Sequence, residues 1–246
     1  MSGSSGFLAL WNGVSDPAIR AEYEAWHTFE HVPERVGLPG FLWARRYAAL
    51  PGRNEQPAYF TLYGLETIAA LLSPQYQDVV DHPTPWSAHM RGFLSDFCRE
   101  PCEAAAFYGT SSGARLATLQ LQLQADEHAE RLSPLLQALV DDGHAVRAGW
   151  GRVDRRSAHP MDGGDGEGHA GSDAVVLLEH IRDELLDKAA DRLIEALPAG
   201  VVLRSRPAFF ELQSAVLRAD LTHPLSARQP PRADLRQHFE TGDKRP

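Results

Sequence analysis

The residues best suited to chemistry lie close together between positions 26 and 35, where the sequence reads WHTFEHVPER. An imidazole can take up and release a proton near neutral pH, and a neighbouring carboxylate can shift its pKa. Glu30 and His31 are the stronger candidates for a site, whereas His27 is expected at the surface or the rim of a cavity. Glu30 has an equally good alternative role in a structural ion pair with Arg45 or Arg46.

A helix from about Asp16 to His31 is predicted to carry these groups. It begins with a capping residue and a proline in its first turn. Apolar residues then recur at spacings of three and four, so that Glu30 falls in the middle of the apolar stripe and the two histidines lie to one side. A carboxylate in that stripe must be paired, hydrogen-bonded or protonated. Pro33 disfavours helical geometry at Val32, and the helix is therefore expected to end near His31.

The same run also reads His-x-x-Glu-His, the pattern of an inverted zinc-protease motif. Such a site needs a continuous helix and a further acidic ligand, whereas Pro33 is expected to end this helix. Cys98 and Cys102 lack the partners for a four-ligand zinc site and are expected to be reduced thiols. We therefore expect no metal.

Composition narrows the class of protein. The chain has 246 residues, 43% of them hydrophobic and 23% charged, which is typical of a globular protein with one large or two small domains. A net charge of -9 argues against nucleic acid as a partner, because phosphate binding needs a basic face. No apolar run is long enough for a membrane span, and residues 1–6 show no signal-peptide pattern, so that a cytoplasmic location is the default expectation.

Periodicity and turn residues divide the rest of the chain into two similar halves. Residues 1–6 are expected to be flexible, and residues 219–246 to form a polar tail or an arm over a neighbouring molecule. Each half is predicted to run strand, helix, strand, strand, helix, strand, which is the ferredoxin-like order. In the first half (7–112) we expect strands at 7–11, 41–48, 58–62 and 103–108 and helices at 16–31, 67–72 and 87–93. In the second half (113–218) we expect strands at 116–124, 145–153, 174–179 and 201–216, the last broken near Pro207, helices at 126–140 and 182–197, and a disordered loop at 157–172.

These elements predict an α+β fold of two tandem ferredoxin-like βαββαβ halves. Each half would present one open sheet face, and packing the two faces together would close a barrel-like core within one chain. The helix predicted at 126–140 has no counterpart of the Glu-His-x-Pro run. A site is therefore expected in the first half, with the second half contributing one wall.

Several of these segments together resemble the EthD-like branch of the dimeric α/β-barrel superfamily. The resemblance covers roughly residues 7–110 and rests on Trp26, Glu30-His31-Val32-Pro33-Glu34-Arg35, Leu38-Pro39-Gly40-Phe41, Ala44-Arg45-Arg46-Tyr47 and Thr84-Pro85-Trp86. It implies a ferredoxin-like fold whose sheets pair into a barrel, with a ligand cavity between each sheet and its helices. Members of the superfamily include isomerases, polyketide cyclases, cofactor-free monooxygenases and haem enzymes, and in several of them a histidine near the cavity is the general acid or base.

The resemblance, together with the residue types, implies a small-molecule enzyme that acts on an aromatic or polyketide-like substrate without metal or cofactor. His31, or less readily His27, would move a proton, Glu30 would orient or tune it, and Arg45 or Arg46 would hold an anionic oxygen. Two alternatives stay open: a haem enzyme with a histidine ligand, and a non-catalytic ligand-binding or accessory protein of a degradative pathway. The fused pair could also form a homodimer. Aromatic residues that could wall the substrate, or simply pack in the core, are Trp11, Trp26, Trp43, Tyr59 and Trp86.

Overall fold

The computed structural model describes residues 4–53, 57–125, 127–156, 172–222 and 228–240. Eight antiparallel strands form a closed barrel in the order β1-β3-β2-β9-β5-β7-β6-β4, and β4 pairs with β1 to complete the ring. The barrel strands are β1 (Gly6–Val14), β2 (Phe41–Ala49), β3 (Tyr59–Leu65), β4 (Leu94–Tyr108), β5 (Arg115–Leu123), β6 (Arg147–Val153), β7 (Ala174–His180) and β9 (Ala208–Leu217).

Each half contributes four neighbouring strands, in the order β4-β1-β3-β2 and β9-β5-β7-β6. This is the ferredoxin-like order, and the two halves join where β4 pairs with β6 and where β2 pairs with β9. The predicted α+β fold of two tandem ferredoxin-like halves is therefore confirmed. The predicted break in the last strand is also present, because β8 (Val201–Leu203) and β9 both pair with β5 but flank Pro207.

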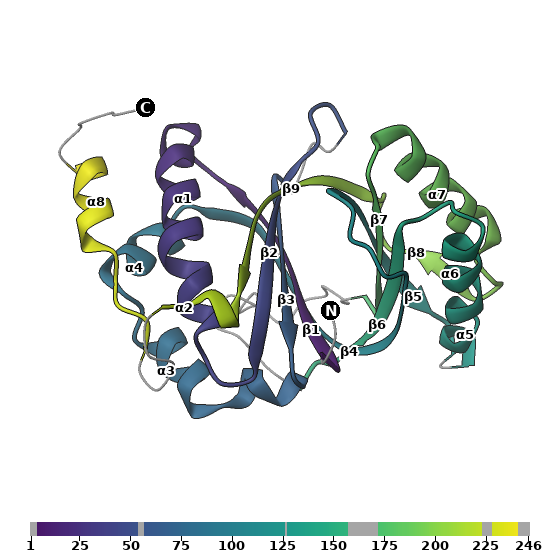
Figure 1. The fold of residues 1–246 in the computed structure, drawn as a ribbon, viewed down its shortest axis with the longest axis horizontal. Helices are drawn as coiled ribbons and strands as arrows, with labels where there is room; N and C mark the ends of the chain where they lie inside the picture. Colours follow the sequence, from purple (N-terminus) through teal and green to yellow (C-terminus); the bar gives the residue numbers. More distant parts are fainter. Residues whose placement is uncertain (1–3, 54–56, 126, 157–171, 223–227, 241–246) are drawn as a thin grey trace.

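Alternation along the strands separates a barrel interior from an outer face that the helices cover. Interior side chains such as Phe60, Leu62 and Phe210 are fully buried in one apolar cluster. Gly64 is required there, since a Cβ at this position would lie 2.1 Å from the Trp43 ring. The helices of the two halves lie on opposite sides of the barrel (Figure 1). They are α1 (Arg20–Trp26), α2 (Val32–Val36), α3 (Pro74–Asp81) and α4 (Pro85–Arg91) in the first half, and α5 (Glu127–Glu130), α6 (Leu132–Asp141) and α7 (Asp183–Ala196) in the second.

The helix that carries the histidines does not end near His31, and that prediction is wrong. It continues through a π-helical segment, His27–His31, into α2, which reaches Val36. The Val32 N–H donates to the carbonyl of His27, five residues earlier. This wider turn places Pro33 in the first turn of α2, where its missing N–H and fixed φ are tolerated. Short π-helical segments of this kind are frequent at functional sites.

The space between sheet and helices is filled in the second half. Leu119, Leu136, Leu186 and Leu193 are at most 1% exposed in a cluster that joins the sheet to α6 and α7. Strand β4 starts at Leu94, much earlier than predicted, because it pairs along its length first with β1 and then with β6. The predicted loop 157–172 lies outside the described residues except for Ser172.

The C-terminal segment was expected to be a loose tail or an arm over a neighbour, and its described part is neither. Residues 228–240, which include α8 (Ala233–Glu240), run along the helices of the chain's own first half (Figure 1). Leu235 packs against the cluster around Trp26, and the Phe239 ring lies 6.1 Å from the Trp86 ring. In the described part of the chain, no helix combines the length and the apolar composition needed to cross a membrane.

Candidate active site

A cavity lies between the outer face of the first-half sheet and the helices that cover it. Water-sized molecules have about 50 Å³ of room in it, and the total space between its lining atoms, including the open mouth, is about 640 Å³. All of its described lining residues come from the first half, so that the second half does not contribute the wall that the sequence led us to expect. They are Leu8, Leu10, Asn12, Trp26, His27, His31, Arg35, Phe41, Tyr63, Tyr76, Arg91, Leu94, Phe97 and Arg99.

Both histidines of the WHTFEHVPER run face this cavity. Their ring centroids are 5.1 Å apart, and the His31 ring lies 4.6 Å from the Trp26 ring. His27 is only 4% exposed, which corrects the prediction that it lies at the surface or the rim. Burial, helped by the positive charges of Arg46 and Arg35, holds the pKa of His27 well below its usual value. His27 is therefore a neutral imidazole at pH 7.

Three arginines give the cavity its charge. Arg35, Arg91 and Arg99 line it, and none of its described lining residues is a carboxylate. Arg91 donates to the carbonyl of Val80 over 2.8 Å, and burial lowers the pKa of its guanidinium. None of the three was among the site residues predicted from the sequence. Arg35 stands inside the singled-out run, and Arg99 has the same strand phase as Phe97 on β4, a signal that became readable only once the true start of β4 was known.

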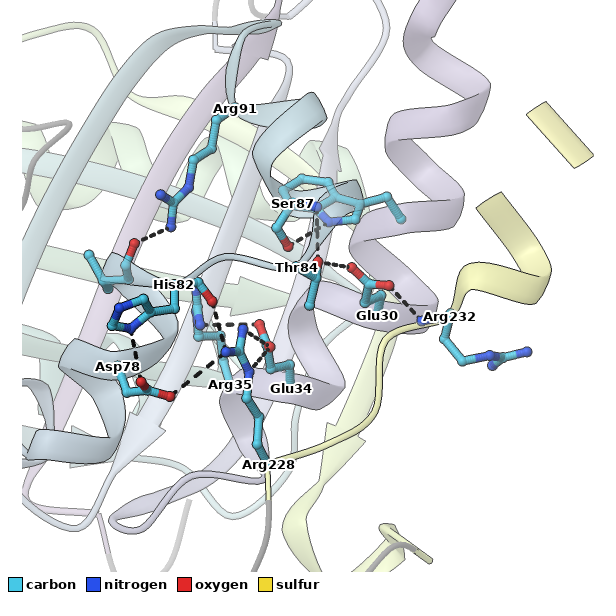
Figure 2. Close-up of polar contacts among 12 residues, drawn as sticks. Glu30, Glu34, Arg35, Asp78, His82, Thr84, Ser87, Arg91, Arg228 and Arg232 are labelled. Atoms are coloured by element: carbon cyan, nitrogen blue, oxygen red, sulfur yellow. Dashed lines mark hydrogen bonds and ion pairs between the residues drawn. The ribbon is translucent and has the colours of Figure 1, made fainter. Parts of the chain in front are cut away.

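Glu30 does not face the cavity. Its Oε1 accepts a hydrogen bond from the Thr84 hydroxyl over 2.5 Å, and its Oε2 accepts one from the backbone N–H of Arg232 over 2.6 Å (Figure 2). Thr84 in turn caps α4 through the N–H of Ser87. Glu30 is 3% exposed, and it ties its own helix to α4 and to the C-terminal segment. Neither Arg45 nor Arg46, its expected ion-pair partners, is bonded to it.

The two predicted anion-binding arginines lie elsewhere. Arg45 is on the face of β2 that lines the barrel interior, where it pairs with Glu179 over 3.2 Å and lies over Trp43. Arg46 is on the helix-covered face, but its guanidinium lies between Tyr23 and Tyr59 and donates to the Thr28 hydroxyl. A prediction from strand phase alone could not tell which face the helices cover.

The aromatic residues that were predicted to line the substrate site also lie in different parts of the structure. Only Trp26 lines the histidine cavity, and its indole N–H donates to the Ser87 hydroxyl over 3.1 Å. Tyr59 on β3 donates to Glu24 over 2.7 Å and so ties α1 to the sheet. Trp86 on α4 donates to Glu22 over 2.9 Å and so ties α4 to α1. Trp43 is buried in the barrel interior.

A second cavity opens at one end of the barrel and is much larger, with about 630 Å³ of room for water-sized molecules. Trp11, Cys98, Thr118 and Gln120 form its inner wall, and Arg206 stands at its rim. No histidine is among its described lining residues. Among the residues that the structure does describe, no group of three or more histidine, cysteine or acidic side chains is arranged to hold a metal ion.

Comparison with known proteins supports the fold. No protein-family model matches the sequence, and no curated protein matches it. Among solved structures, an anthrone oxidase-like protein superposes with a TM-score of 0.57 at 9% identity over 89% of this chain and 95% of its own. A "putative monooxygenase" from Fusobacterium nucleatum gives 0.51 at 10% identity over 88% and 96%, and chlorite dismutase from Candidatus Nitrospira defluvii gives 0.54 at 10% over 87% and 93%.

Proposed function

The chain has the dimeric α/β-barrel fold, and we propose that it is an enzyme that acts on a small aromatic or polyketide-like anion by histidine-mediated proton transfer. One observation carries the proposal: two imidazoles and three guanidinium groups meet in a single cavity with aromatic walls. Arginine presents a fixed fork of donors to anionic oxygens, and histidine is the side chain that transfers protons near neutral pH. The dimeric α/β-barrel neighbours support a small-molecule enzyme on this fold.

We assign the proton transfer to His31, which is partly exposed to the cavity and lies beside Trp26. The proton passes from an acidic C–H or O–H of the substrate to an imidazole nitrogen, and the electron pair stays on the substrate as an enolate or phenolate. Arg35 and Arg99 stabilise that developing negative oxygen. His27, held neutral by burial, serves as a hydrogen-bonding partner inside the cavity.

The reaction class within this chemistry is isomerisation, cyclisation, or oxygenation of a substrate anion that itself passes electrons to oxygen. The anthrone oxidase-like and monooxygenase neighbours support the last of these. The EthD-like branch stays part of the proposal and rests on the sequence motifs alone. Two of the segments that carry these motifs are in contact, because Trp26 donates to Ser87 and Thr84 donates to Glu30.

Haem, which the resemblance raised as an alternative, fits the structure less well. The first-half cavity has about 50 Å³ of room for water-sized molecules, so that even a single aromatic ring requires the rim side chains Arg91, Leu94 and Phe97 to shift. A porphyrin macrocycle is several rings wide. The larger second cavity, and the apolar cluster between sheet and helices in the second half, contain no histidine among their described residues. We therefore derive no step through haem.

Native mass spectrometry of the protein purified from its own host, with an absorbance spectrum on the same sample, tests the proposal. We expect a retained aromatic or polyketide-like acid in a one-to-one complex, and a weaker complex for Arg99→Met. Trp11 lines only the second cavity, so that Trp11→Phe is a control for ligand bound there. A haem absorbance band would refute the proposal. A bound acid that the protein never converts would instead support the accessory role.

A further inference from the structure

The C-terminal segment is the second partner of both buried carboxylates on the histidine-bearing helix. We call residues 228–240 the C-terminal arm. Arg232 of the arm binds Glu30, as described above, and Arg228 binds Glu34. The Arg228 Nε donates to Glu34 Oε1 over 2.7 Å, and Glu34 is 1% exposed (Figure 2). Arg228 also donates to the carbonyl of His82 over 2.8 Å, just before α4.

Glu34 connects the arm to the cavity. Its other oxygen, Oε2, accepts a hydrogen bond from Arg35 over 3.2 Å, and Arg35 lines the cavity. One carboxylate is thus shared between a guanidinium of the arm and a guanidinium of the proposed site. While Arg228 occupies Oε1, the negative charge of Glu34 is divided between two cations, and Arg35 keeps more of its positive charge toward the cavity.

The arm also packs tightly against the end of α2. Gly37, at the end of α2, is buried beneath Gln229, and a Cβ at this position would lie 2.8 Å from the Gln229 Cγ. The backbone of Gly37 has φ -66°, so that alanine is acceptable there apart from this contact. Gly92, at the end of α4, has a similar φ of -68°, but its Cβ would meet only the carbonyl of His89, at 3.6 Å. Alanine at Gly37 should therefore displace the arm, and alanine at Gly92 is the matched control that should not.

From this geometry we propose that the C-terminal arm is a clamp: Arg228 holds Glu34 in place and offsets its negative charge, so that Arg35 is positioned at the cavity with its positive charge less compensated. The Arg228–Glu34–Arg35 relay thereby sets the affinity of the cavity for its anionic ligand. Arg228 and Glu34 are positioning residues, because neither lines the cavity. When the arm leaves, Glu34 neutralises Arg35 alone and the cavity loses positive potential. This inference rests on the proposed function in one respect only, namely that the cavity binds an anion.

The test uses the full-length protein with Arg228→Gln and Gly37→Ala to weaken the arm. Arg232→Ala and Gly92→Ala are the controls. The Arg232 side chain pairs with Asp234 of the arm itself, and its alanine variant keeps the backbone N–H that reaches Glu30. Hydrogen exchange of the amides in α8 reports whether the arm is seated. Binding of 2-naphthoate, a planar aromatic carboxylate, reports the anion affinity, and the NMR titration of His27 reports the positive potential in the cavity, to which Arg35 contributes.

In Arg228→Gln and Gly37→Ala we expect faster hydrogen exchange in α8 and a higher pKa of His27. We also expect the affinity for 2-naphthoate to fall at least about threefold, the size of effect expected when one partly buried charge pair is weakened. The pKa of His27 rises because Arg35 is one of the charges that depress it. Both controls should match the wild type. An arm that loses protection while affinity and His27 titration stay unchanged would overturn the proposal, as would an Arg228→Gln variant that matches the wild type throughout.

Failure of the proposed function would look different. Suppose that the wild type binds no 2-naphthoate, but that the pKa of His27 still changes in Arg228→Gln and not in Arg232→Ala. The relay would then be supported and the anion-binding function would be refuted. If Arg228→Gln does not fold, Gly37→Ala still decides the question, because it leaves both members of the Glu34–Arg35 pair in place.

Discussion

Replacing His27 with glutamine should remove a specific part of the pH dependence of stability. In the folded protein burial holds the pKa of His27 well below 6.5, and in the unfolded chain the imidazole titrates near 6.5. A buried histidine with a lowered pKa contributes stability above the unfolded-state pKa, where it is neutral in both states. That contribution is lost as the pH falls from about 6.5 toward the folded-state pKa, because only the unfolded chain then takes up the proton.

The slope follows from linkage. One proton bound only by the unfolded state costs about 1.4 kcal/mol of unfolding free energy for each pH unit below the unfolded-state pKa. Between pH 6 and pH 5 the wild type should therefore lose roughly 1 kcal/mol more than His27→Gln. Buried Glu100 and Glu179, whose pKa values burial raises, also titrate, but they are present in both proteins and cancel in the difference.

Urea denaturation at pH 5, 6, 7 and 8 measures this difference. The offset between His27→Gln and the wild type should be constant from pH 7 to 8 and should shrink toward pH 5. His82→Gln is the control, since the side chain of His82 is 76% exposed. Two parallel stability curves for His27→Gln and the wild type would refute the reasoning. They would mean that His27 titrates as a solvated side chain and that the cavity does not exclude water from it.

Two further substitutions test the packing around the site. Glu30→Ala should lower the free energy of unfolding by about 3 kcal/mol, because it leaves the Thr84 hydroxyl and the Arg232 N–H without their carboxylate acceptor. Urea denaturation measures the loss, and a change below about 1 kcal/mol would contradict the role assigned to Glu30. Gly64→Ala should cost about 1 to 3 kcal/mol, because its Cβ would overlap the buried Trp43 ring, and a thermal unfolding temperature equal to that of the wild type would contradict this packing.

Local sequence signals predicted the fold well because each half repeats a complete unit. Alternating strands, bounded helices and turn residues gave the ferredoxin-like order, and the break at Pro207 followed from the missing N–H of proline. The start of β4 was missed because residues 94–102 do not alternate, and Pro101 lies among them. Pairing with β1 holds this segment in the sheet, and a long-range effect of this kind has no local signature.

The site was predicted in part. The run around Glu30 and His31 does adjoin a cavity. Helical phase did not predict that both histidines face this cavity while Glu30 points away from it, because the π-helical segment changes the direction in which the side chains of this helix point. Arg45 was named in place of Arg99 because strand phase gives two faces without saying which one the helices cover. The partner of Glu30 could not be foreseen from nearby residues, since Arg232 lies 202 positions away.

Solvent exchange measures the central claim, that His31 transfers a proton to and from a bound anion, most directly. The acid retained by the protein is incubated in D₂O with wild type or His31→Ala, and the rate at which its acidic C–H exchanges is followed by NMR. We predict exchange catalysed by the wild type and slowed about 10²- to 10⁴-fold by His31→Ala, the usual contribution of a general acid–base residue. Equal exchange rates for the two proteins would contradict the account.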